Sequence, residues 1–147
     1  MRKQWIALLG VVAALGLAAP ARAAAVHAYI ANLTGAQETP PNDSDSLGMA
    51  FMFLDPQGRL CYAISFTRLS TAEVAAHIHG PAAPGASANV LFALTPAGNP
   101  KNGCAGPLSA TDKKNLKKGL LYLNIHSAKF PNGEIRGQVV PAGVIKQ

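Results

Sequence analysis

The alternation that decides the fold lies in Leu60-Cys61-Tyr62-Ala63-Ile64-Ser65-Phe66-Thr67. Large apolar residues occupy every second position of this stretch, which is the pattern of a half-buried β-strand. Residues 47–54 alternate in the same way, with Leu, Met, Phe and Phe on one face of the expected strand. The sequence Pro56-Gln57-Gly58 between the two stretches is typical of a tight turn. These features predict two neighbouring strands joined by a hairpin.

Similar alternation recurs along the chain and separates it into short strands and loops. The predicted strands are residues 26–33, 47–54, 60–67, 73–79, 89–94, 120–126 and 134–140. The predicted loops are residues 37–46, 80–87 and 98–107. Because these strands lack the spacing of strand–helix–strand units, we expect an all-β, antiparallel Greek-key β-sandwich of the immunoglobulin type.

Residues 111–119 depart from this alternation and predict one short helix. Thr111 is a suitable N-cap, and Asp112 matches the positive end of the helix dipole. Lysines fill the last turn, and Gly119 suits the left-handed conformation that ends many helices. The alternative interpretation of the lysine cluster is a binding site for a polyanion.

Residues 1–23 have the features of a cleaved secretory signal peptide. A basic pair at residues 2–3 precedes an apolar run over residues 5–17, and residues 21–23 form the small-x-small pattern of a cleavage site. The apolar run is shorter than the ~20 residues that a membrane-spanning helix needs. We therefore expect a secreted or periplasmic protein with a single domain, residues 24–147, and no stable membrane span after cleavage.

Composition and motifs exclude several classes of function. The formal net charge of the chain is +6, and three of its cations lie in the predicted signal peptide, so the mature net charge is +3. The remaining cations are scattered, which argues against a nucleic-acid partner. The chain lacks the glycine motifs of nucleotide-binding proteins, the H-E-x-x-H metalloprotease motif and the G-x-S-x-G motif of hydrolases. The sequence therefore favours a binding or structural domain over an enzyme.

Cys61 and Cys104 are the two cysteines of the chain. Two cysteines in an exported domain predict a disulfide, which here would close a loop of 44 residues, counted from 61 to 104 inclusive. A pair of metal-binding thiolates is the alternative, although the spacing matches no common thiolate site.

Three of the four histidines form the candidate site. His77 and His79 are two apart on one predicted strand and therefore point to the same face, and His126 shares a face with Tyr122 and Asn124 on another. If these strands are close, three imidazoles meet at one point and could bind a single transition-metal ion, with copper favoured and zinc the second choice. The alternative is that the histidines are half-buried and bond to loop carbonyls. The fourth, His27, is expected to be exposed rather than a ligand.

Glu134 and Arg136 also lie two apart and are expected to share a strand face. One interpretation is an ion pair and hydrogen-bond network that ties the last strand to its neighbours. The other is that Glu134 accepts a hydrogen bond from one of the imidazoles and orients it. Tyr122 and Asn124 are expected to support the histidines or the fold in the same way.

Five sequence blocks together identify a family resemblance. The blocks are Ala36-Gln37-Glu38-Thr39-Pro40-Pro41, Leu60-Cys61-Tyr62, Ala76-His77-Ile78-His79-Gly80, Tyr122-Leu123-Asn124-Ile125-His126-Ser127 and Pro131-Asn132-Gly133-Glu134-Ile135-Arg136-Gly137-Gln138. In this order they resemble the CHRD (chordin-type) domain. The resemblance implies an extracytoplasmic β-sandwich with an extracellular protein partner and no firmly assigned reaction.

A more distant similarity links the chain to the copper/zinc superoxide dismutase sandwich. His77 and His79 match the paired copper ligands of that family, and His126 could stand for another ligand. The segment after them is Gly80-Pro81, and no second cluster of zinc ligands follows. The similarity therefore favours a mononuclear copper site over a complete dismutase site. A redox enzyme of the dismutase type is the third functional hypothesis.

Overall fold

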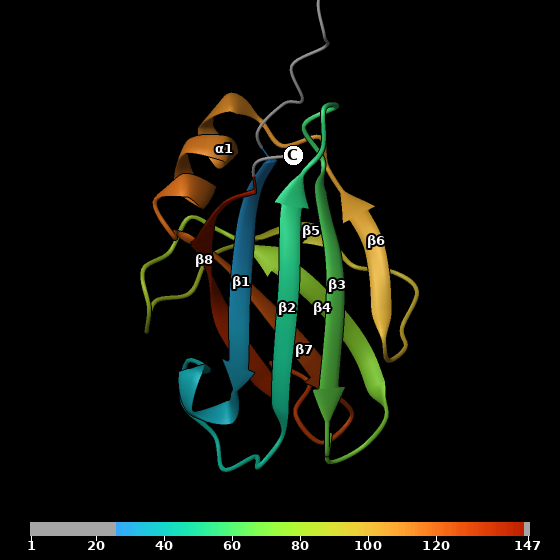
Figure 1. Cartoon of the computed structure of the whole chain (residues 1–147). Helices are drawn as coiled ribbons and strands as arrows, with labels where there is room; N and C mark the ends of the chain where they lie inside the picture. Colours follow the sequence, from blue (N-terminus) through green and yellow to red (C-terminus); the bar gives the residue numbers. More distant parts are fainter. Residues whose placement is uncertain (1–25, 146–147) are drawn as a thin grey trace, which may run out of the picture.

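The structure of the chain is a computed structural model that describes residues 26–145, so the predicted signal peptide lies outside the described residues. Strands dominate it, with one 3-10 turn and one short α-helix (Figure 1). In chain order the elements are β1 (Val26–Thr34), η1 (Gly35–Gln37), β2 (Leu47–Leu54), β3 (Leu60–Thr67), β4 (Glu73–His79), β5 (Val90–Ala93), β6 (Lys101–Ala105), α1 (Ala110–Lys117), β7 (Leu121–Ser127) and β8 (Ile135–Ile145).

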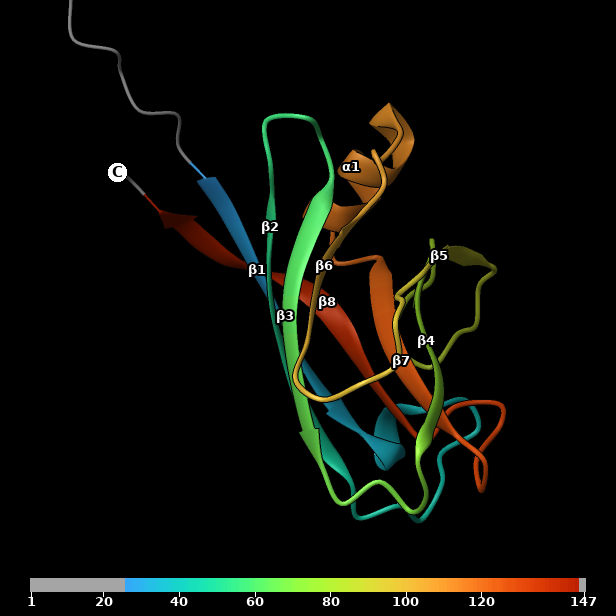
Figure 2. The same cartoon turned by 90° about the vertical axis from the view of Figure 1, so that its right-hand side faces the viewer.

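The strands form one eight-stranded antiparallel sheet in the order β5-β4-β7-β8-β1-β2-β3-β6. This sheet folds over itself, so that the half containing β4 and β7 lies opposite the half containing β2 and β3 (Figure 2). The 11-residue strand β8 pairs with both β7 and β1 and joins the two halves. The prediction of an all-β antiparallel fold with one short helix is confirmed, and its two layers belong to one continuous sheet.

The hydrophobic core lies between the two halves of the sheet. The predicted hairpin is present, because Leu54 pairs with Leu60 at its closed end. Alternate residues of each strand point inward, as the period of two requires. The aliphatic side chains at the centre of the core are at most 1% exposed: Leu33, Leu60, Ile64, Ile78, Leu121, Leu123, Ile125 and Ile135.

The prediction of a loop over residues 98–107 is wrong in part, because Lys101–Ala105 forms the edge strand β6 beside β3. Strand β6 shows little apolar alternation, and two long-range links hold it in place. One is the disulfide. The other is a buried ion pair, in which Lys101 Nζ lies 2.8 Å from Glu73 Oε1 and also donates to the carbonyls of Leu94 and Pro96.

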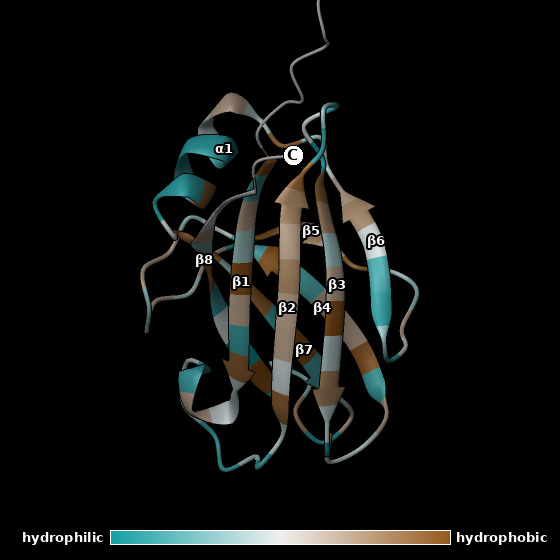
Figure 3. Cartoon of the chain, in the orientation of Figure 1, coloured by the Kyte–Doolittle hydropathy of each residue, from teal (hydrophilic) through white to brown (hydrophobic). Residues whose placement is uncertain are grey.

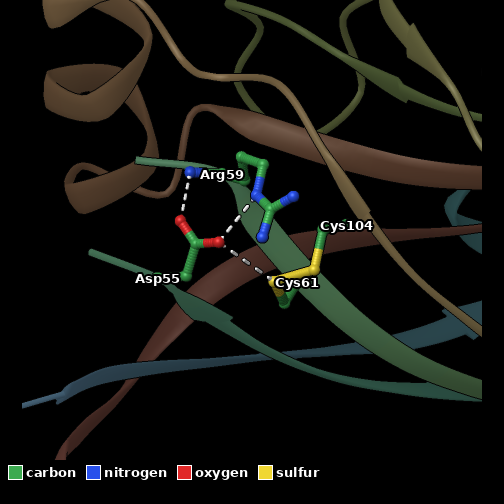
Figure 4. Close-up of a disulfide and its surroundings, with 4 residues drawn as sticks. All are labelled: Asp55, Arg59, Cys61 and Cys104. Carbon is green, nitrogen blue, oxygen red and sulfur yellow. Dashed lines mark hydrogen bonds and ion pairs between the residues drawn. A yellow bond between two sulfur atoms is a disulfide. The ribbon is translucent and has the colours of Figure 1, made fainter. Parts of the chain in front are cut away.

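The predicted disulfide between Cys61 and Cys104 is confirmed, with an S–S distance of 2.02 Å (Figure 4). The two cysteines are directly opposite each other in the β3–β6 ladder. Asp55 Oδ2 lies 3.8 Å from Cys61 Sγ, so these three residues form a compact acidic and sulfur-containing group. Because both sulfurs are in the disulfide, the alternative of a thiolate metal site is wrong.

The predicted short helix is present, but its N-cap is Ser109 and not Thr111. Ser109 Oγ accepts a hydrogen bond from the backbone N–H of Asp112 at 3.0 Å, which satisfies one free donor of the first turn. Gly119 follows the helix with φ of +69°, the left-handed conformation expected of it. None of the helices in the described part of the chain has the length and apolar character needed to cross a membrane.

The outer face of β4, β7 and β8 is polar, yet loops cover it. Asn42 in the loop before β2 donates to the carbonyls of Gly133 and Glu134. Gln138 on β8 donates to the carbonyls of Ala82 and Gly119. Most candidate residues of this face therefore lie between the sheet and its loops, and His77 is only half-buried.

Candidate metal site

The structure brings the three predicted histidines together on this covered face. His77 and His79 lie on β4, and His126 lies on the neighbouring strand β7. One potential ligand atom from each residue lies within 4.8 Å of the other two. His77 Nδ1 and His126 Nε2 are 2.9 Å apart. His79 and His126 are each 8% exposed, whereas His77 is half-buried, so the cluster has one accessible side.

Backbone carbonyls orient two of the three imidazoles. His79 Nδ1 lies 2.9 Å from the carbonyl oxygen of Ala88, and His126 Nδ1 lies 2.9 Å from that of Pro131. A carbonyl oxygen accepts hydrogen bonds and does not donate, so each Nδ1 carries the proton. In the neutral imidazoles, the lone pair is then on Nε2 of both rings. Both Nε2 atoms point into the cluster.

Asn124 lies on β7 between the two oriented rings. Its Oδ1 atom is 3.0 Å from His79 Nε2 and 3.1 Å from His126 Nε2. With the amide in this orientation, three acceptor atoms face one another, and His77 Nδ1–H, 2.9 Å from His126 Nε2, can donate to only one of them. Two arrangements remove the repulsion: a cation among the lone pairs, or the amide turned over so that Nδ2 donates to both rings. The orientation of the Asn124 amide therefore decides whether the two Nε2 lone pairs are already satisfied by hydrogen bonds.

Burial keeps His77 and His126 in the neutral form. Burial lowers the pKa of His77 below its ordinary value of 6.5, and the neighbouring rings of His126 and His79 lower this pKa further. Burial also lowers the pKa of His126; the hydrogen bond to Pro131 opposes this shift, and His79 adds to it. At neutral pH both imidazoles are therefore uncharged, the protonation state in which imidazole binds metal ions.

Tyr122 and Arg136 support His79 from the side. The ring of Tyr122 stacks on His79 with 4.7 Å between ring centroids and an interplanar angle of 3°. The guanidinium carbon of Arg136 lies 3.5 Å from the centre of the Tyr122 ring. Arg136 donates to Thr39 and to the carbonyl of Ala86, and Tyr122 bonds to Ala88. The stack therefore fixes the loop whose Ala88 carbonyl orients His79.

Glu134 has hydroxyl and backbone partners rather than an imidazole or Arg136. Its Oε1 atom accepts from Ser44 Oγ at 2.8 Å and from the N–H of Ser70 at 2.7 Å, and Ser46 Oγ is 2.8 Å away. Among the described residues, its ion pair with Arg136 and its hydrogen bond to an imidazole are both absent. Serine hydroxyls and a backbone N–H therefore hold Glu134 in a hydrogen-bond network, in place of the expected partner Arg136.

These hydrogen bonds set the ionisation of Glu134. Burial of the carboxyl raises its pKa, but bonds from Ser127, the Ser70 N–H, Ser44 and Ser46 outweigh burial and bring the pKa to about 2. The carboxylate stays ionised across the physiological range. It ties the start of β8 to the loops before β2 and β4. The loop before β2 is one of those that cover the outer face of β4, β7 and β8.

Sequence reasoning missed the role of Glu38, although it lies in one of the quoted blocks. This residue is 8% exposed and lines two surface cavities of about 280 and 270 Å³. Within the described residues its Oε1 atom has no hydrogen-bond partner. Burial raises its pKa to about 7, although the Arg136 guanidinium and the Thr39 N–H oppose the shift. Gly133 lies against this carboxyl, and its φ of +130° is a conformation that residues with a side chain rarely adopt.

His27, which is exposed on β1, is not part of the cluster. The predicted exposure of His27 is confirmed.

No signal in the sequence could have identified the buried pair of Lys101 and Glu73, because its members come from a predicted loop and a strand end.

Comparison with known proteins shows which family the chain resembles. The family model described as CHRD domain matches residues 29–139. Chordin of Danio rerio is 33% identical over 115 residues, which cover 73% of this chain and 12% of chordin. The chain therefore corresponds to a small part of that much longer protein. No solved structure matches the chain, so the more distant similarity to copper/zinc superoxide dismutase stays a prediction.

Proposed function

This chain belongs to the CHRD domain family, and we propose that it is a secreted or periplasmic binding protein whose three-histidine cluster holds one transition-metal ion. Copper is the first choice and zinc the second. The disulfide between Cys61 and Cys104 supports an oxidising compartment, because such bonds persist mainly in exported proteins. A protein partner of the kind expected for an extracellular domain is part of the same proposal.

One observation carries the proposal for the metal. His79 Nε2 and His126 Nε2 lie 3.0 and 3.1 Å from the same atom, Asn124 Oδ1, and carbonyl acceptors hold both rings in the tautomer that leaves the lone pair on Nε2. Metal-binding histidines have this second hydrogen bond as a rule, since it fixes the ring and increases the basicity of the ligand nitrogen. If the histidines are only structural, Asn124 Nδ2 donates to both lone pairs instead, and the cluster needs no cation.

The distances are suitable for a small ion. Two nitrogens that each bind a metal at ~2.0 Å and at a right angle are about 2.8 Å apart, close to the 2.9 Å between His77 Nδ1 and His126 Nε2. The third nitrogen must move by less than about 1 Å if opposite ligands are ~4 Å apart, because all three are within 4.8 Å. Right-angle geometry and nitrogen ligands favour copper(II), which also has the highest intrinsic affinity.

The proposal is tested by thermal unfolding of the exported form, residues 24–147, with and without Cu(II) or Zn(II). A metal at a thousandfold excess over its Kd adds about 4 kcal/mol to the free energy of unfolding, which raises the Tm of a domain of this size by roughly 10 °C or more. His79→Ala and His126→Ala should abolish this rise. His27→Ala is the matched control, since it removes an exposed imidazole outside the cluster, and it should retain the rise.

The alternative is an interaction domain in which the histidines are structural. In that case His79→Ala lowers the Tm, and added copper or zinc changes the Tm of neither the variant nor the parent protein. A rise in Tm that persists in His79→Ala but disappears in His27→Ala would place copper at the N-terminal end of the chain and contradict the proposal.

A further inference from the structure

Asn124 lies among the three histidines because of the pattern of its strand. Hydrophobic and hydrophilic residues alternate along β7, which directs the side chains of Asn124 and His126 to the same face (Figure 3). In the sheet, Asn124 pairs with His77 of β4 on one side and with Arg136 of β8 on the other. Sites built on strands are held more precisely than sites on loops. The amide of Asn124, a residue that is 4% exposed, is therefore a fixed part of the cluster.

Four polar atoms follow one another around the cluster at similar distances. His77 Nδ1 is 2.9 Å from His126 Nε2, and His126 Nε2 is 3.1 Å from Asn124 Oδ1. Asn124 Oδ1 is in turn 3.0 Å from His79 Nε2. The potential ligand atoms of His79 and His77 lie within 4.8 Å of each other, which limits the fourth side. The four atoms therefore outline a quadrilateral with three sides of nearly equal length.

Hydrogen bonds alone do not satisfy this arrangement of atoms. His126 Nε2 has one lone pair but two neighbours at hydrogen-bond distance, His77 and Asn124. If both neighbours donate, they compete for that lone pair; if the amide oxygen faces the ring, two acceptors repel each other. No carbonyl fixes the proton of His77 in the way that Pro131 fixes that of His126, so His77 can hold its proton on Nε2 and offer the lone pair of Nδ1. All four atoms can then direct a lone pair to one ion.

We propose that Asn124 Oδ1 is the fourth ligand of the metal ion and completes a planar set of three nitrogens and one oxygen for copper(II). This inference rests on the proposed function and assigns a ligand that the three-histidine site lacks. Metal bonds of ~2.0 Å to atoms at the printed separations enclose angles of about 93°, 102° and 97°, on average closer to a square than to a tetrahedron. Square coordination by nitrogen and oxygen is typical of copper(II), whereas zinc prefers a tetrahedron.

The competing role of Asn124 is that of a hydrogen-bond donor. With the amide turned over, its Nδ2 atom donates to His79 Nε2 and His126 Nε2 and occupies the lone pairs that a metal needs. The two roles predict opposite effects when the amide is removed. Loss of a ligand weakens copper binding, whereas loss of a competing donor leaves copper binding unchanged or strengthens it.

The copper affinity of Asn124→Leu in the exported form therefore distinguishes the two roles. Leucine has nearly the same size as asparagine and can neither donate a hydrogen bond nor bind a metal. The dissociation constant for Cu(II), measured by competition with a chelator, should rise at least tenfold. Asn124→Asp keeps an oxygen at the same position and should bind Cu(II) at least as tightly as the parent. Asn32→Leu is the matched control, since it removes an exposed amide on β1, and it should keep the parental affinity.

Electron paramagnetic resonance in ¹⁷O-enriched water adds a readout that a structural role would not change. In the parent protein, Asn124 Oδ1 occupies the fourth position of the plane, so the copper signal should stay as narrow as in ordinary water. In Asn124→Leu a water molecule takes the free position, and its ¹⁷O nucleus should broaden the signal. Circular dichroism verifies that the variant keeps the fold.

Each failure has its own signature. Unchanged or tighter Cu(II) binding by Asn124→Leu, or equal ¹⁷O broadening in the parent and the variant, overturns the assignment of Asn124 and leaves the three-histidine site in place. If Asn124→Leu does not fold, Asn124→Asp decides, because weaker Cu(II) binding by this variant than by the parent contradicts a ligand role. If the parent protein takes up no Cu(II), the proposed function itself fails and this inference fails with it.

Discussion

Replacing the buried carboxylate of Glu134 tests how the loops over the histidine face are held. Glu134→Gln keeps the shape of the side chain and removes its charge. The pKa of about 2 in the folded protein is ~2.5 units below the value of 4.5 for a free Glu. Each pKa unit corresponds to about 1.4 kcal/mol, so ionised Glu134 contributes about 3 kcal/mol to the free energy of unfolding at pH 7.

The pH dependence follows from the direction of this shift. Because the pKa is lowered on folding, the contribution is fully present above pH 4.5 and is lost as the pH falls toward 2. At pH 3, where the folded protein holds the charge and the unfolded chain is largely protonated, roughly 1.4 kcal/mol should remain. The loss caused by Glu134→Gln should therefore shrink from about 3 kcal/mol at pH 7 to about 1.4 kcal/mol at pH 3.

The assay is urea unfolding of the parent protein and the variant at both pH values, with the disulfide intact. Asp43→Asn is the matched control, because Asp43 is an exposed carboxylate in the loop that also holds Ser44 and Ser46. Its effect should stay within about 0.5 kcal/mol. An equal loss at pH 7 and pH 3 in Glu134→Gln, or a loss below 1 kcal/mol at pH 7, would refute the reasoning.

Three further substitutions have expected outcomes that urea unfolding measures. Glu38→Gln should raise the free energy of unfolding at pH 8 by up to about 3 kcal/mol and change it little at pH 4. The reason is that the pKa of Glu38 is about 7 in the folded protein, so its ionisation above pH 4.5 opposes folding. Destabilisation by Glu38→Gln at pH 8 would contradict this. Lys101→Ala should lower the free energy of unfolding by about 3–5 kcal/mol at pH 7, because it leaves Glu73 buried without its partner. The double change Lys101→Met with Glu73→Gln should recover most of this loss. Arg136→Lys should cost about 1–2 kcal/mol, because an ammonium group cannot both stack flat on Tyr122 and bond to Thr39 and Ala86; no loss would show that the stack is unimportant.

Alternation in the sequence predicts which side chains share a face, because the pleat of a strand admits only two directions. His77 and His79 point away from Ile78, and Asn124 and His126 point away from Ile125, as expected. The disulfide was also predictable, since the chain has two cysteines and the features of an exported protein. The sequence blocks that identify the family surround the same histidines.

Alternation does not reveal what covers a face. The loop carbonyls of Ala88 and Pro131, which orient the rings, come from segments without periodicity, and backbone atoms leave no trace in the residue types. Strand β6 was missed because its position depends on Cys104 and Lys101 and not on an apolar pattern. The outward position of Leu47, Met49, Phe51 and Phe53 on β2 was not predictable either, because a period of two is the same whichever side faces the core.

Electron paramagnetic resonance of the His27→Ala protein loaded with one equivalent of Cu(II) tests the central claim most directly. We predict a tetragonal copper signal coupled to three imidazole nitrogens, and the loss of this signal after the additional change His79→Ala. The spectrum of copper in buffer, or a signal that His79→Ala and His126→Ala leave unchanged, would contradict the metal site.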